Sequence, residues 1–273
     1  MKRVLILLTI MSIGIYAKEI KTFACGITKI AYLTKLNAAY AKKTNQDMKV
    51  VGRGGAPRAI QLMGAQKVVI SSGCRPPLGL KGEENVQAHQ VAWGAIVAIV
   101  NIKNPISNIT SQQFKDILTG KITNWQEVGG KDEPIQVYAR TGKTSGVGYS
   151  VRMVLFNDKE TSFTEDSRRK GSSGPIRRAV TKGENIFAVD DFVTASKYKR
   201  LKILSIDGVK PSKETIQNGE YKYYRPLFLY SYGDPSGENK KFLEFALSKE
   251  GQKIISDNDV VNLLEGKNLK RIY

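Results

Sequence analysis

Short apolar runs alternate with amphipathic segments along the first part of the chain. Three apolar runs, at Ile20–Ala24, Met48–Val51 and Val68–Ile70, predict β-strands. Between them, apolar residues at helical spacing predict an amphipathic helix at Ile30–Lys42 and a short helix at Pro57–Met63. Such an alternation is typical of the α/β class with a parallel sheet.

A longer apolar run, Ala92–Val100, predicts a buried strand and opens a second unit. A helix is expected to begin after a cap at Thr110, or at the serine that follows it, and to end at Gly120. The strand Pro226–Tyr230 and a helix at Asn239–Ile255 are expected to return to the first unit. Two crossings between the units predict two lobes around a cleft.

Three turns with glycine and polar residues follow the first three predicted strands. They are Gly26–Lys29, Gly52–Gly55 and Ser71–Gly73. Because ligands of open α/β sheets bind at the carboxyl ends of the strands, these turns are expected to line the opening of one ligand-binding cleft.

The stretch Tyr138–Ser150, YARTGKTSGVGYS, joins an apolar strand-like run to an amphipathic helix-like run. Backbone N–H groups at a glycine-rich turn that opens a helix are partly positive and can hold an oxyanion. Arg140 offers a forked donor, and Thr144 and Ser145 offer hydroxyl donors. This chemistry predicts a site that holds an anion without transforming it.

The N-terminus has the layout of a secretory signal peptide. Lys2 and Arg3 precede a short apolar run, Val4–Ile15, which is too short to span a bilayer comfortably, and Ala17 ends the segment. We expect cleavage after Ala17 and a soluble mature protein in an exported compartment, most simply a bacterial periplasm. Lipidation is not expected, because Cys25 lies too far beyond the apolar run.

The chain is strongly basic, with 43 Lys and Arg against 25 Asp and Glu and a net charge of +18. Without Lys2 and Arg3, the mature chain still carries 41 basic residues and a charge of +16. The cations are spread along the sequence, with no basic and aromatic interleaving and no zinc pattern. We therefore expect no nucleic-acid partner, but a field that attracts small anions.

Two cysteines, Cys25 and Cys74, remain in the exported part, each shortly after a predicted strand. An oxidising compartment favours a disulfide, and burial as two separate small hydrophobic residues is the alternative. The sequence leaves both open, because it does not fix the distance between the two strand ends.

Two long segments resemble the periplasmic phosphate-binding protein family, the substrate-binding subunits of phosphate ABC importers. Val91–Trp125 is similar to the family's first hinge strand and the segment after it, and Ile206–Tyr230 is similar to the second hinge. The resemblance implies a type II periplasmic binding protein fold: an α/β protein of two lobes, each a mixed, mostly parallel sheet flanked by helices, with the ligand cleft between them. It implies lobe 1 at 18–97 plus 228–273, lobe 2 at 98–227, a monomer, an inorganic phosphate ligand and an importer permease as partner.

The family's four ligand loops fall on Gly26–Ile30, Gly52–Gly55, Ser71–Ser72 and a fourth loop formed by Arg140 and Ser145–Val147. The ligand-binding residues implied by this match and by the Tyr138–Ser150 loop are Thr28, Lys29, Arg53, Ser71, Ser72, Arg140, Thr144, Ser145 and Gly146.

Some residues depart from the family pattern. Lys29 and Arg53 stand where hydroxyl residues are usual, Val147 replaces a Thr, and Ser72 stands where some members carry an Asp. A site without a carboxylate to accept the phosphate proton would select anions by charge more than by proton count. Phosphate with weakened discrimination, a larger phosphorylated ligand, another tetrahedral oxyanion and a site that has lost its ligand all stay open.

Other function classes find less support. Gly142–Thr144 resembles the end of a nucleotide-binding P-loop, but that motif requires glycine where Val137 stands. The only histidine, His89, has no nearby acidic pattern and is expected to be structural or at the surface. We expect no enzyme, catalytic residue, metal or cofactor. An exported adhesion or anion-binding module of the same fold, without a transport role, is the alternative function.

Overall fold

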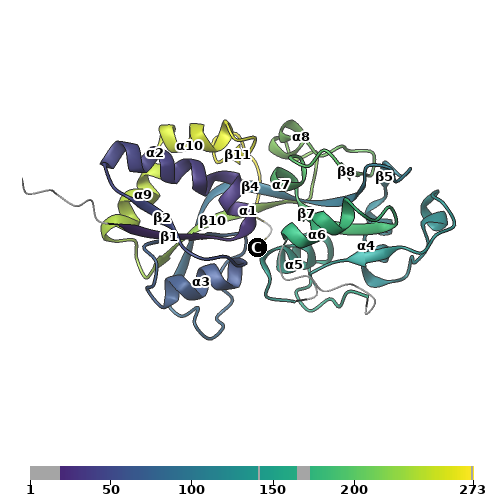
Figure 1. Ribbon diagram of the computed structural model, residues 1–273, viewed down its shortest axis with the longest axis horizontal. Coiled ribbons are helices and arrows are strands. Elements are labelled where there is room, and N and C mark those ends of the chain that lie inside the picture. Colours follow the sequence, from purple (N-terminus) through teal and green to yellow (C-terminus); the bar gives the residue numbers. More distant parts are fainter. Residues whose placement is uncertain (1–18, 141, 165–172, 272) are drawn as a thin grey trace, which may run out of the picture.

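The protein forms two lobes that lie side by side and are joined by long strands (Figure 1). The computed structural model describes residues 19–140, 142–164, 173–271 and 273. The predicted signal peptide, residues 1–17, lies outside the described residues.

Lobe 1 is built around the first three strands, β1 (Ile20–Ala24), β2 (Met48–Val50) and β3 (Ile70–Gly73). β1 lies between β2 and β3 and pairs with both in parallel, which confirms the parallel arrangement expected from the sequence pattern. The helices of this lobe are α1 (Gly26–Thr28), the π-helix η1 (Lys29–Leu33), α2 (Thr34–Thr44), α3 (Ala56–Gly64), α9 (Gly237–Leu247) and α10 (Lys249–Ser256).

Two long strands run from one lobe to the other. β4 (Val86–Asn101) pairs with β10 (Tyr224–Tyr232) from Val86 to Ala95, whereas Ile96 to Asn101 pair with strands of lobe 2. β10 lies between β3 and β4 and is antiparallel to both. The sheet is therefore mixed, as expected, and its antiparallel pairs are those made by β4 and β10.

Lobe 2 continues the sheet with β7 (Ile186–Asp191) and β6 (Gln136–Tyr138), which pair in parallel. Of the two caps that the sequence allowed, Thr110 is the one present, and it forms a capping box with Gln113. Gly120 ends the helix, as expected, with a φ of 80°. The other elements of lobe 2 are β5 (Asn108–Ile109), α4 (Ser111–Thr119), the 3-10 helix η2 (Trp125–Val128), α5 (Gly146–Val151), the π-helix η3 (Arg152–Phe156), α6 (Ser173–Val180), α7 (Phe192–Ala195), β8 (Leu201–Ile203), β9 (Ser205–Ile206) and α8 (Lys213–Gln217). The short strand β11 (Val261–Asn262) follows α10 and pairs with the lobe 1 part of β4.

Three local expectations from the sequence are wrong. The predicted turn at Gly26–Lys29 is helical, because α1 begins at Gly26 and η1 at Lys29. The predicted strand at Val68–Ile70 lies later, at Ile70–Gly73, so Ser71 and Ser72 belong to a buried strand and not to a turn at the cleft. The predicted C-terminal helix is two helices, because Ser248 is extended and caps α10 by accepting a bond from the Gly251 N–H.

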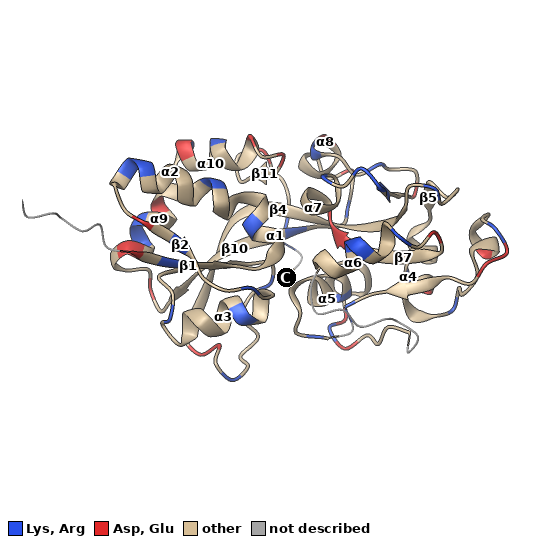
Figure 2. Ribbon diagram, in the orientation of Figure 1, with Lys and Arg blue, Asp and Glu red and all other residues tan. Residues whose placement is uncertain are grey.

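The C-terminal helices return to lobe 1, as expected. The ring of Tyr40 in α2 contacts the ring of Phe242 in α9 with centroids 5.1 Å apart. In the described part of the chain, no helix combines the length and the apolar character needed to cross a bilayer. Lys and Arg are spread over both lobes (Figure 2).

Candidate anion site

A cavity of about 950 Å³ lies between the lobes and takes its lining from both of them. The amino-terminal ends of four helical segments border it, α1 and α3 from lobe 1 and α5 and α6 from lobe 2 (Figure 1). The bordering residues are Cys25, Gly26 and Ile27 at α1, Gly55, Ala56, Pro57 and Arg58 at α3, Ser145, Gly146 and Val147 at α5, and Ser173 and Gly174 at α6.

These helix ends give the cavity a positive potential without any titratable group. The first N–H groups of a helix have no partner within the helix, and the helix dipole makes that end partly positive. α1 continues without a break through η1 and α2 to Thr44, and α5 continues through η3 to Phe156. Gly55 has no side chain to bond to the first turn of α3, so N–H donors of α3 remain for a ligand. The Cys25 sulfur, in contrast, lies 3.3 Å from the Thr28 hydroxyl of α1.

Five cationic side chains are among the described residues that line the cavity. Lys29, Arg53 and Arg58 come from lobe 1 and are exposed, and Arg140 and Arg177 come from lobe 2. No Asp or Glu of the described chain lines the same space. The cavity therefore favours an anion through both backbone and side-chain charge.

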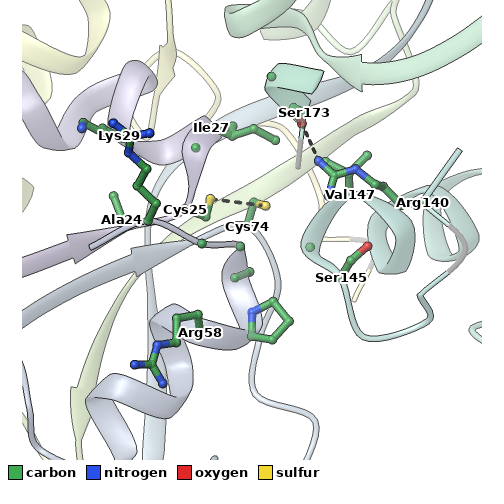
Figure 3. A pocket seen from close by; sticks show the side chains of 18 of the residues that line it. Ala24, Cys25, Ile27, Lys29, Arg58, Cys74, Arg140, Ser145, Val147 and Ser173 are labelled. Atoms are coloured by element: carbon green, nitrogen blue, oxygen red, sulfur yellow. Dashed lines mark hydrogen bonds between the residues drawn. The ribbon is translucent and has the colours of Figure 1, made fainter. Parts of the chain in front are cut away.

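A hydrogen bond to the start of α6 holds the Arg140 side chain at the cavity wall. Its Nη2 donates to the hydroxyl of Ser173, the first residue of α6, over 2.9 Å (Figure 3). Burial lowers the pKa of Arg140, but a guanidinium stays protonated in proteins. The side chain is thus a charged donor in a fixed position.

Arg177 is a second cation at the lobe 2 wall. Its Nη1 donates to Asp190 over 2.6 Å, and its guanidinium lies 4.9 Å from the ring centroid of Tyr198. Burial works against its charge, but Asp190 raises the pKa of Arg177 on balance. The buried Nε of Arg177 has no hydrogen-bond partner among the described residues. Arg177 is thus a cation held at the cavity wall by its ion pair.

The structure brings five of the predicted ligand residues to the cavity. They are Lys29, Arg53, Arg140, Ser145 and Gly146. Ser145 also caps α5, because its hydroxyl accepts a 3.0 Å bond from the Gly148 N–H. A hydroxyl used as a cap can still donate its own proton to a ligand.

Four predicted residues do not line the cavity. The hydroxyls of Thr28 and Ser72 lie 2.8 Å apart and bond to each other, and the Ser71 hydroxyl donates to the Ala59 carbonyl over 2.7 Å. All three residues are buried behind the wall. Thr144 is exposed, and its carbonyl accepts a 2.6 Å bond from Arg75 Nε of lobe 1.

The cavity also has residues that sequence reasoning missed, namely Arg58, Ser173 and Arg177. Arg58 lies in the first turn of α3, three residues after the cap residue Gly55. The sequence signal for Arg58 was the cationic residue just inside a helix start, and for Arg177 it was the Arg177–Arg178 pair on an amphipathic helix.

The two cysteines are part of the wall as well. Cys25 and Cys74 both line the cavity, and their sulfur atoms lie 3.7 Å apart as free thiols (Figure 3). His89 lies elsewhere, with Nε2 2.7 Å from the Ser231 hydroxyl, where burial lowers its pKa. Within the described residues no three His, Cys, Asp or Glu side chains are grouped so as to hold a metal ion.

Comparison with known proteins agrees with this geometry. Residues 26–250 match the PBP superfamily domain. The phosphate-binding protein PstS of Bacillus subtilis is 31% identical over 183 residues, which cover 66% of this chain and 58% of that protein. The PstS of Staphylococcus epidermidis strain RP62A is 28% identical over 260 residues, which cover 86% of this chain and 77% of that protein.

Solved structures show the same fold. A structure from Clostridium perfringens, assigned as a phosphate ABC transporter substrate-binding protein and solved with bound phosphate, has a TM-score of 0.80 at 25% identity and covers 90% of this chain and 99% of its own. An ABC-type phosphate transport receptor from Vibrio cholerae has a TM-score of 0.62 at 24% identity, covering 89% of this chain and 99% of its own. The chain has the two-lobed α/β fold of type II periplasmic binding proteins, and it belongs to the PBP superfamily.

Proposed function

We propose that this protein is an exported solute-binding protein that captures inorganic phosphate, or a closely related oxyanion, between its lobes and delivers it to an ABC importer. The observation that carries the proposal is the convergence of four helix amino-termini and five cations on a cavity that no described carboxylate lines. The phosphate-binding relatives support the choice of ligand. Holding an anion requires no catalytic group, so the protein acts as a receptor and not as an enzyme.

The proposed contact set combines the predicted and the additional cavity residues. Arg140 and Arg177 approach the anion from lobe 2, and Lys29, Arg53 and Arg58 approach it from lobe 1. Backbone N–H groups and hydroxyls at the starts of α5 and α6 complete the shell through Ser145, Gly146 and Ser173. Thr28, Ser71 and Ser72 have a positioning role, since their bonds hold α1 and α3 against β3, and Thr144 acts through its carbonyl.

We propose that the two lobes close around the ligand, and the strand topology supports this. We propose the boundaries 18–97 plus 228–273 for lobe 1 and 98–227 for lobe 2. The change of pairing partner between Ala95 and Ile96 in β4 supports a hinge near the first boundary. The protein acts as a monomer in the periplasm after removal of residues 1–17, and an importer permease receives the ligand.

Titration calorimetry with inorganic phosphate tests this function, with sulfate as the matched control anion at near-physiological salt, which suppresses loose attraction by net charge. We expect saturable one-to-one binding of phosphate, with sulfate weaker by a modest factor, because the described lining offers charge but no carboxylate to accept the phosphate proton. Equal weak binding of both anions, or none, would favour a changed ligand or the adhesion role.

Substitution of Arg140 tests the site. Arg140→Ala is expected to abolish phosphate binding and to leave the unfolding transition intact. Arg200→Ala is the matched control, because it removes the same charge from an exposed position of the same lobe that does not line the cavity. Unchanged affinity in Arg140→Ala would refute the assignment of the site.

A further inference from the structure

The backbone holds Cys25 and Cys74 at the ends of two neighbouring strands. They follow β1 and β3, which pair in parallel with Ala24 opposite Ser72, and the Cys25 N–H continues the ladder with a 3.1 Å bond to the Ser72 carbonyl. The two sulfur atoms are 3.7 Å apart. For a disulfide to form, the sulfur atoms have to approach from 3.7 Å to the roughly 2.05 Å of an S–S bond.

A reagent can reach this pair of cysteines through the cavity. Cys25 and Cys74 are only 3% and 2% exposed, yet both line the cavity wall. Gly146 of lobe 2 lies directly against Cys74, since a Cβ at position 146 would clash with the Cys74 sulfur. The pair therefore lies where lobe 1 meets the start of α5 and next to the space proposed for the anion.

The two thiols have opposite acid–base character. Cys25 precedes the long helical run that begins at Gly26, and the hydrogen bond from Cys74 outweighs burial and lowers the pKa of Cys25 to about 6. The pKa of Cys74 is raised well above its usual value by its bond to Cys25 and by burial. The ionisable groups around the pair are Tyr32, Arg140, Asp191, Arg225, Tyr230 and Tyr273.

We propose that Cys25 and Cys74 form a redox-active dithiol in the wall of the anion cavity, and that its oxidation to a disulfide strengthens anion binding. The oxidant is a small-molecule or protein disulfide. The Cys25 thiolate attacks one sulfur of that disulfide and displaces a thiolate, which takes up a proton. Cys74 then loses its proton and attacks the Cys25 sulfur, so that the Cys25–Cys74 bond forms and the second half of the oxidant leaves as a thiol.

The link to anion binding is a change of charge at one helix end. In the reduced protein, the Cys25 thiolate occupies the positive start of the α1 run and repels an anion in the cavity. The disulfide is neutral and removes that repulsion. One charge removed near the ligand, in a partly shielded cavity, corresponds to roughly a five- to tenfold gain in affinity. This second part of the proposal rests on the proposed anion-binding function.

Disulfide formation is tested first, without any ligand. Purified reduced protein is incubated with oxidised glutathione, and free thiols and intact mass are measured before and after. We expect both thiols to disappear together, the mass to fall by two hydrogens, and reduced dithiothreitol in excess to reverse the change. Two thiols that remain free, or a product linked between chains, would overturn the redox assignment.

The effect on binding is tested by titrating the oxidised and reduced forms with inorganic phosphate. The oxidised form is expected to bind more tightly, and Cys25→Ser under reducing conditions is expected to match it, because serine carries no charge. The Cys25→Ser/Cys74→Ser protein is the control and should not respond to oxidant. Equal affinity of the two redox forms would refute the coupling. If no form binds phosphate, the proposed function fails, while thiol counts and mass still decide the redox chemistry.

Discussion

Two groups of arginines in this protein have opposite surroundings. Arg75 and Arg225 are fully buried and each pairs with a buried carboxylate, Glu83 and Asp191 respectively. Arg53 and Arg58 are exposed at the cavity, and no ion pair joins them to an acidic residue in the part of the chain that the structure describes.

The buried group holds the lobes together. Arg75 Nε donates to the Thr144 carbonyl of lobe 2 over 2.6 Å. Arg225 Nη1 donates to the Cys74 carbonyl of lobe 1 over 3.1 Å and to the Ser150 hydroxyl of lobe 2 over 2.8 Å. Arg75 and Arg225, which are neutralised inside the protein, connect the two lobes, whereas Arg53 and Arg58 have no carboxylate partner among the described residues and remain for the ligand.

The largest effect is expected from Arg225→Met. Burial raises the pKa of the Asp191 carboxyl even though Arg225 opposes this, so removal of the guanidinium leaves a buried carboxylate without compensation. We expect a loss of about 3–5 kcal/mol in the free energy of unfolding, measured by urea denaturation. Asp191→Asn/Arg225→Met should recover much of the loss, and a deficit below about 1 kcal/mol in the single variant would show that the pair is not needed.

Gly146→Ala tests the contact between the lobes at the cavity. A methyl group at this position would clash with the Cys74 sulfur and lie 3.0 Å from the Ala56 Cβ. The expected cost is about 1–3 kcal/mol of stability, together with weaker phosphate binding because the lobes are pushed apart. Gly142→Ala is the control, since a Cβ there meets no atom within 4 Å. Equal behaviour of the two variants would mean that the lobes do not need to meet at α5.

The pH dependence of the reduced protein reports on the charge of Cys25. The pKa of this thiol is lowered to about 6 in the folded state from its usual 9.0. A lowered acid pKa adds stability that is complete above pH 9 and is lost as the pH falls towards 6. Urea denaturation should therefore show that reduced wild type gains about 3 kcal/mol over Cys25→Ser between pH 6 and pH 8.5. A constant difference across this range would exclude a thiolate at Cys25.

The smallest effects are expected from Arg53→Ala and Arg58→Ala. Exposed cations are screened by water and salt, so each variant should lose about 0.5 kcal/mol of phosphate binding free energy at low salt and less at high salt. Their unfolding transitions should match that of wild type, in contrast to Arg225→Met. A loss of stability in either variant would remove the distinction between the two groups of arginines.

The sequence predicted the local structure of the fold better than the lining of the site. The strand at Ile20–Ala24 and the helix cap at Thr110 depend on neighbouring residues, and both are confirmed. Ser71 and Ser72 were expected at the cleft, but β3 extends through them and buries their hydroxyls. Arg58 and Arg177 were missed because their place at the cavity depends on which helix face meets the opposite lobe, and that is a property of the whole tertiary structure.

The position of β10 also decides when lobe 1 can fold. β10 lies between β3 and β4, although it follows them by more than a hundred residues in the chain. Until residues 224–232 have been made, β3 and β4 have no strand to join them, and their edges stay open. The sheet of lobe 1 can therefore close only after nearly the whole polypeptide has been made. Its folding depends on this long-range pairing and cannot be completed from the N-terminal residues alone.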